Sequence, residues 1–232
     1  MKNKVLVIGA DHHNTLGIVE SLGQKGLNSY VLIVGENINS FVLKSRYVIE
    51  GWVCSSPEQV VDEMLKHFSD TKNKVIVYSS YDNISSVLDS SVQRLSPFFI
   101  LPVTNMPGSL ERKMSKEYMS DLAREVGLDV PRTWMVSDRE VPTDIEFPCI
   151  TKAISSVEGS KKNIKICKKR EELEEFLANS EHCPIIQIQK FIIKDFEFQF
   201  LGCSMDNGKH IIISGRTHID RPNGIDNTFF LK

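Results

Sequence analysis

Short apolar runs alternate with helical patterns over the first 105 residues, and this alternation constrains the fold more than any other feature of the sequence. The predicted strands are Lys4–Ile8, Ser29–Val34, Arg46–Glu50 and Lys74–Tyr78. The predicted helices are Asn14–Lys25, one that begins at Ser56-Pro57-Glu58 with the serine as its cap, and Ile84–Leu95. Strands that alternate with helices predict a parallel, doubly wound α/β sheet.

Polar residues follow the predicted strands, at the edge of the sheet where such folds bind ligands. Asp11 and His12 come directly after the first strand, and Asp82 follows the fourth. All three are candidate substrate contacts, although Asp82 fits a helix cap equally well. A metal pair at His12 and His13 is disfavoured, because adjacent residues on an extended chain point to opposite sides. The loop also lacks the GxGxxG pattern of dinucleotide sites.

Composition excludes several functional classes. The 28 basic and 30 acidic residues leave a net charge of −2, which gives no support for a nucleic-acid partner. No apolar run approaches the roughly 18–20 residues of a membrane span, and the first run ends too early for a signal peptide. The five cysteines are odd in number and show no CxxC spacing, so we expect a reduced, cytoplasmic setting without zinc.

The pattern changes near Asn105-Met106-Pro107-Gly108, a sequence typical of a hinge. We therefore expect a Rossmann-like domain over residues 1–105, a linker over 106–113 and a second domain over 114–232. The second half is predicted as α+β with mostly antiparallel strands. Its predicted helices are Met114–Val126 and Lys169–Asn179, and its strands lie near 133–136, 147–152, 162–168, 185–190, 195–204 and 209–216.

Two lysines of the second half are candidates for binding phosphate. A nucleoside triphosphate carries about four negative charges near neutral pH, so its site needs fixed cations or backbone donors. Lys116 opens a predicted helix, and Lys152 ends an apolar strand, where an unpaired buried charge would be costly. Alternatively, Lys152 is a strand-end lysine that reaches water, and Lys116 is an ordinary residue of an exposed helix.

A small polar loop separates two of the predicted strands. It contains Gly159 and Ser160, whose amides and hydroxyl can approach phosphate oxygens. The alternative is an ordinary hairpin loop, because the GxxxxGK[ST] pattern of Walker sites is absent from the sequence.

The strand near 185–190 has a polar end suited to an adenine ring, which a backbone N–H and C=O can recognise beside apolar side chains. The residues predicted to frame the ring are Gln189, Lys190, Phe191 and Ile192. Glu197 is a candidate for the ribose hydroxyls, with a solvent-facing role as the alternative. Arg216, near the end of the last strand, is a candidate for a phosphate or a substrate carboxylate.

Taken in this order, the signals resemble the N-terminal part of the ATP-grasp superfamily, in the group similar to the carbamoyl-phosphate synthase large subunit and the carboxylate–amine ligases. Ser21-Leu22-Gly23, Ser45-Arg46-Tyr47 and Tyr81-Asp82 match a pre-ATP-grasp domain, and residues 113–216 match the first ATP-grasp subdomain and the start of the second. The resemblance implies that ATP with Mg²⁺ activates a small-molecule carboxylate as an acyl phosphate, which an amine then attacks.

The resemblance also implies roles for single residues. Lys116 and Lys152 would contact phosphates, with Lys152 also near the adenine, and the loop around Gly159-Ser160 would cover the phosphates. The residues from Gln189 to Ile192 would frame the adenine, and Glu197 would hold the ribose. Gln189 stands where many members have glutamate.

The family's magnesium ligands lie downstream of the matched segment, and Asp220, Asp226 and Asn227 stand in a different context. We therefore expect the Mg²⁺ ligands outside this chain, an incomplete second subdomain and no assignable catalytic residue. The apolar Phe229-Phe230-Leu231 suggests a partner, either a second copy or a missing C-terminal half. Two other functions stay open: a non-catalytic nucleotide-binding or interaction module, and a Rossmann-type dinucleotide or sugar enzyme that uses only the first half.

Overall fold

The computed structural model describes residues 3–103, 106–137, 139–153, 164–180, 185–193, 197–205 and 209–219. The chain divides into two compact units, residues 1–122 and 123–232, here called unit 1 and unit 2. The predicted domain bounds, with a linker at 106–113, stay a prediction. Within the described ranges, no helix is long and apolar enough to cross a membrane.

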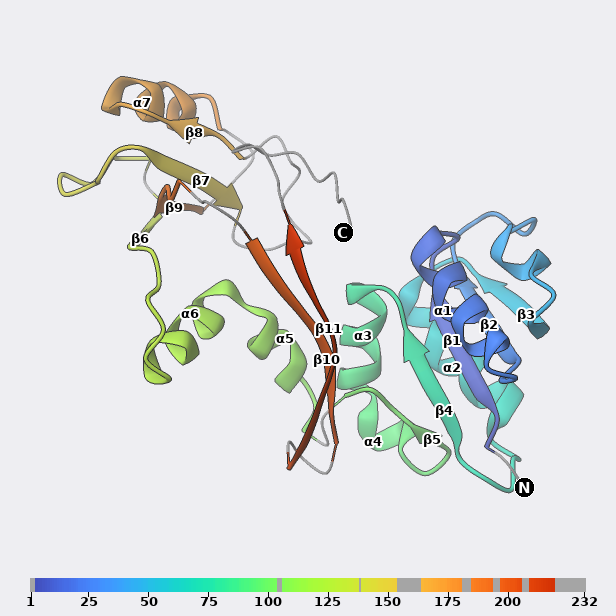
Figure 1. The fold of residues 1–232 in the computed structure, drawn as a ribbon. Helices are drawn as coiled ribbons and strands as arrows, with labels where there is room; N and C mark the ends of the chain where they lie inside the picture. Colours follow the sequence, from blue (N-terminus) through green and yellow to red (C-terminus); the bar gives the residue numbers. More distant parts are fainter. Residues whose placement is uncertain are drawn as a thin grey trace. The chain divides into compact units, whose positions relative to one another are not determined.

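Unit 1 is built on a parallel sheet, as the alternating pattern predicts (Figure 1). Its strands, in the spatial order β3-β2-β1-β4-β5, are β1 (Val5–Gly9), β2 (Ser29–Val34), β3 (Val48–Cys54), β4 (Val75–Ser79) and β5 (Phe99–Ile100). Its helices are α1 (His13–Gln24), η1 (Val42–Lys44), η2 (Pro57–Gln59), α2 (Val60–Phe68), α3 (Asp82–Ser90), α4 (Val92–Leu95) and α5 (Ser109–Met114). The helix α6 (Lys116–Glu125) begins in unit 1 and ends in unit 2.

Both faces of this sheet are covered, because successive side chains of β1 alternate between two apolar clusters. Val5 and Val7 pack with residues of α1 and η1. Leu6 and Ile8 pack with residues of α2 and α3 on the opposite face. All four side chains are buried, which explains why the strand is apolar along its whole length.

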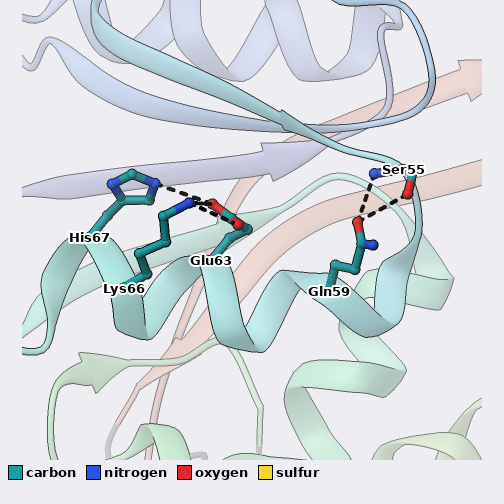
Figure 2. A network of polar contacts seen from close by, with 5 residues as sticks. All are labelled: Ser55, Gln59, Glu63, Lys66 and His67. Atoms are coloured by element: carbon teal, nitrogen blue, oxygen red, sulfur yellow. Dashed lines mark hydrogen bonds and ion pairs between the residues drawn. The ribbon is translucent and has the colours of Figure 1, made fainter.

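The start of α2 matches the prediction in position but not in every contact. Ser56 is extended and holds the cap position, and Pro57 follows as the first residue of the single 3₁₀ turn η2; the side chain of Ser56 makes no cap hydrogen bond, and the α-helix begins only at Val60. Oε1 of Gln59 accepts hydrogen bonds from the amide and the hydroxyl of Ser55, each at 3.0 Å (Figure 2). This contact fixes the segment just ahead of the cap position.

The other end of α2 carries an ion-pair cluster. Glu63 accepts hydrogen bonds from Lys66 at 3.1 Å and contacts His67 Nε2 at 3.2 Å (Figure 2). The hydrogen bond from Lys66, the largest cause, holds the pKa of Glu63 below its ordinary value. The ring of His67 stacks on Trp52 at a centroid distance of 4.0 Å, which joins the helix to β3. Since the lysine is largely exposed, the pair adds little to stability.

Unit 2 contains an antiparallel sheet with one apolar face, as the α+β pattern of the second half predicts. Its strands, in the order β6-β9-β7-β8, are β6 (Thr133–Val136), β9 (Ile186–Lys190), β7 (Cys149–Ala153) and β8 (Ile166–Cys167). The helix α7 (Arg170–Ala178) lies beside this sheet (Figure 1). Its Leu173 and Leu177 pack against the apolar face. A separate antiparallel pair is formed by β10 (Glu197–Met205) and β11 (His210–Ile219).

Two thiols lie side by side inside this second core. Cys149 and Cys167 are opposite each other in the register of β7 and β8, and both are buried. Burial, with the neighbouring Cys167 thiol as the second cause, raises the pKa of Cys149 to about 12. Burial also raises the pKa of Cys167. Cys203, by contrast, is exposed.

The first prediction concerns two glycines of α1. A Cβ at Gly23 would lie 2.1 Å from Cγ of Tyr47, whereas a Cβ at Gly17 meets nothing within 4 Å. We expect Gly23→Ala to lower the free energy of unfolding by about 2 kcal/mol, because the helix must move off Tyr47. Gly17→Ala is the matched control and should raise it by up to about 1 kcal/mol through helix propensity. Urea unfolding measures both; equal effects would contradict the packing at Gly23.

The second prediction concerns thiol reactivity. In a Cys183→Ser background, Cys203 should react with Ellman's reagent within minutes in the native protein at mildly alkaline pH. Cys149 and Cys167 should react only after unfolding, because they are buried and almost fully protonated. Mass mapping of the labelled peptides identifies the sites. Fast native labelling of Cys149 would show that the second core is not closed as described.

Candidate functional site

The four-stranded sheet of unit 2 has a polar face opposite α7. Residues paired across an antiparallel sheet share a face, and successive residues alternate between faces. Gln189 pairs with Thr133 on β6 and with Ile150 on β7, so Lys152, two residues after Ile150, lies on the same face. This face, called here the Lys152 face, is distinct from the one that α7 covers.

A chain of hydrogen bonds joins three side chains on the Lys152 face. The ammonium of Lys152 donates to Oε1 of Gln189 at 2.9 Å, and Nε2 of Gln189 donates to Oγ1 of Thr133 at 3.2 Å. All three residues are half-buried. The structure thus brings together Lys152 and Gln189, which the sequence suggested separately. Sequence reasoning missed Thr133, which the two-residue alternation of the strand at 133–136 could have placed on this face.

Lys190 lies on the other face of the same strand. Its ammonium forms an ion pair with Glu146 at 2.6 Å, and this contact is the largest cause of the lowered pKa of Glu146. The amide of Lys190 donates to the carbonyl of Arg132, and the amide of Phe191 donates to that of Pro148, each at 2.9 Å. Two amides of the predicted adenine frame are therefore used within the sheet.

The remaining predicted nucleotide contacts are placed by their backbone only. Lys116 is the first residue of α6, Glu197 is the first residue of β10, and Arg216 lies opposite Phe200 in the β10–β11 pair. Ile192 follows β9 and is 56% exposed. The predicted phosphate loop, with Gly159 and Ser160, lies outside the described residues.

The early candidates Asp11 and His12 have structural partners. Asp11 accepts hydrogen bonds from the hydroxyl of Ser40 at 2.5 Å and from the amide of Val42 at 3.3 Å, which holds the segment after β2. His12 caps α1, because its Nδ1 accepts a hydrogen bond from the amide of Asn14 at 3.3 Å. Both residues shape the end of β1, and a substrate contact by either stays a prediction.

Asp82 instead borders a hollow in unit 1. Asp82 is the first residue of α3, and Tyr81, not Asp82, holds the cap position. The hollow has a volume of about 790 Å³ and opens to solvent beside the carboxyl ends of β1 and β4. It is lined by His13, Asn14, Gly17, Ile18, Ser21 and Leu22 of α1 and by Tyr78, Ser79, Ser80, Tyr81, Asp82 and Ser85.

Neither region holds an evident metal site. In the part of the chain that the structure describes, no group of three or more His, Cys, Asp or Glu side chains is placed to bind a metal ion.

The sequence matches no protein-family model, and no curated protein matches it. Solved structures do resemble the fold. An L-amino acid ligase from Bacillus licheniformis superposes with a TM-score of 0.71 at 16% identity, over 99% of this chain and 54% of that one. An N5-carboxyaminoimidazole synthetase from Staphylococcus aureus gives 0.69 at 10% identity, over 96% and 56%.

A third similar structure is the biotin carboxylase domain of 2-oxoglutarate carboxylase from Hydrogenobacter thermophilus, in complex with MgADP, ADP and bicarbonate. It gives a TM-score of 0.66 at 14% identity, over 96% of this chain and 52% of that one. The chain thus spans about half the length of these structures. These similarities show the ATP-grasp fold over the part of each structure that the chain covers.

Proposed function

We propose that this chain is the ATP-binding portion of an ATP-dependent carboxylate–amine ligase, and that the nucleotide lies against the Lys152 face. The observation that carries this proposal is the hydrogen bond of Lys152 to Gln189, which holds a cation on the polar side of an otherwise apolar sheet. Several similar structures are named for complexes with ADP, which supports a nucleotide in this fold.

In this proposal Lys152 binds phosphate oxygens, since hydrogen bonds from an ammonium to phosphate oxygens are charge-assisted and strong. The exposed Ile192 packs on the adenine, and amides beyond Phe191 serve as the adenine donors, because those of Lys190 and Phe191 are already used. Lys116, Glu197 and the loop around Gly159 and Ser160 complete the nucleotide site as the resemblance implies.

The proposed reaction has two balanced steps. A carboxylate oxygen of the first substrate attacks the γ-phosphorus of ATP and releases ADP. The nitrogen of an amine then attacks the acyl carbon of the acyl phosphate, inorganic phosphate leaves, and the nitrogen loses a proton. Lys152 neutralises charge on the phosphates in the first step, so its contribution is electrostatic and positional. The proposal assigns the metal ligands to a part of the enzyme outside this chain.

The third prediction tests the Lys152 face by calorimetric titration of ATP with Mg²⁺. Lys152→Ala should weaken ATP binding by about tenfold or more, because the phosphates lose a fixed cation. Lys190→Ala is the matched control: it removes the same charge from the opposite face of the same sheet and should change the affinity by less than about twofold. Equal losses in both variants, or none in Lys152→Ala, would overturn the proposed site.

The second candidate function is a non-catalytic nucleotide-binding or interaction module. A non-catalytic module would bind ATP at the Lys152 face without releasing phosphate from it. An assay of ATP-dependent phosphate release, with small carboxylates and amines present, separates this module from a ligase. A dinucleotide enzyme that uses unit 1 alone would instead be insensitive to Lys152→Ala.

A further inference from the structure

Two cysteines of the unit 2 core lie at one register position of its sheet. Cys149 on β7 is directly opposite Cys167 on β8, and both are free thiols with no exposed surface. Both side chains belong to the apolar cluster that includes the leucines of α7, on the face of the sheet opposite Lys152. The proposed nucleotide site therefore uses neither thiol.

Packing alone does not require two thiols at this position. A buried cysteine packs as a small apolar side chain, and alanine or valine meets the same need. Two thiols that face each other add a reaction that other small side chains lack, because oxidation can join them. After burial, the Cys167 thiol is the next cause of the raised pKa of Cys149, so the two thiols are neighbours as well as register partners.

The backbone geometry of an antiparallel pair fits a disulfide. Residues directly opposite each other have Cα atoms about 4.5–5.5 Å apart, and the Cα atoms of a disulfide lie about 4.4–6.8 Å apart. Hydrogen bonds fix the register beside the pair: the amide of Thr151 donates to the carbonyl of Lys165 at 2.9 Å, and the amide of Lys165 donates to Oγ1 of Thr151 at 3.0 Å. The two sulfur atoms can therefore be joined without a change of register.

The position of β8 gives an oxidant a route to the pair. β8 is the edge strand of the sheet, and its two residues, Ile166 and Cys167, pair with β7. A short edge strand opens locally at a lower free energy than a central strand. Burial raises the pKa of both thiols, so the closed core keeps them protonated and the reaction depends on this local opening.

We propose that Cys149 and Cys167 are a reversible oxidation site, at which a peroxide converts the two thiols into a cross-strand disulfide. In the reduced protein the pair is part of the apolar core, and in the oxidised protein it fixes β8 to β7. This inference does not rest on the proposed function, because the two thiols and Lys152 lie on opposite faces of the sheet.

The oxidation has two steps. One thiolate attacks an oxygen of hydrogen peroxide; the O–O bond breaks, hydroxide leaves, and the sulfur becomes a sulfenic acid. The second thiolate attacks that sulfur; the S–O bond breaks, a second hydroxide leaves, and the S–S bond forms. The two thiols lose two electrons to the peroxide, and their two protons convert the two hydroxides into water.

The test begins with the whole reduced chain, which is treated with a small molar excess of hydrogen peroxide. The remaining thiols are then blocked with iodoacetamide in denaturant, and mass spectrometry maps the disulfides. We expect a crosslink between Cys149 and Cys167 within one chain as the main product. The melting temperature should rise by about 5 °C or more, because the crosslink restricts the unfolded chain, and dithiothreitol should return it to the reduced value.

Cys54 is the internal control, because it is buried and, among the described residues, its apolar cluster contains no second cysteine. It should be recovered as an alkylated thiol. Cys167→Ala should lose both the crosslink and the rise in melting temperature. Recovery of Cys149 and Cys167 as free thiols, a crosslink of either one to another cysteine, or a melting temperature lowered by the crosslink would each overturn the inference. ATP binding that Lys152→Ala weakens would still stand in all three cases.

Discussion

The complete burial of β1 is the constraint on which unit 1 depends. Its side chains enter apolar clusters on both faces, and its backbone pairs with β2 on one side and β4 on the other. A strand in this position must lie inside the sheet, and the chain can leave it only through a helix on one face. The reversal of strand order beside β1, and with it the hollow lined by Ser80 and Asp82, follows from that position.

Unit 2 also depends on the alternation of side chains between the two faces of its sheet, but with a different result. Its sheet buries one face under α7, so the opposite face is free to carry polar groups. Lys152 and Gln189 meet on that face, while Lys190, one residue later, turns to Glu146. Adjacent positions on β9 thus have unlike surroundings, and a one-residue shift in register would exchange them.

The two polar regions differ in electrostatic character. The Lys152 face offers a cation, whereas the residues that line the hollow of unit 1 include Asp82, hydroxyls and tyrosine rings but no lysine or arginine. The alternation of side chains produces the first, and the reversal of strand order produces the second.

The periodicity of apolar residues in the sequence by itself determined much of the fold of this protein. The apolar run at Val5–Ile8 and the helical spacing after it fix a parallel sheet, because no other arrangement buries such strands on both faces. Residue type and order also pointed to Lys152 and Gln189. The sequence also placed the helix start at Ser56-Pro57, although a 3₁₀ turn comes first and the Ser56 side chain makes no cap hydrogen bond. Only the tertiary structure decided that Gln189 holds Lys152, that Asp11 and His12 are used within the fold, and that Gly17 faces open space. The contacts of Lys152 and Asp11 join residues far apart in the chain, which local pattern does not encode.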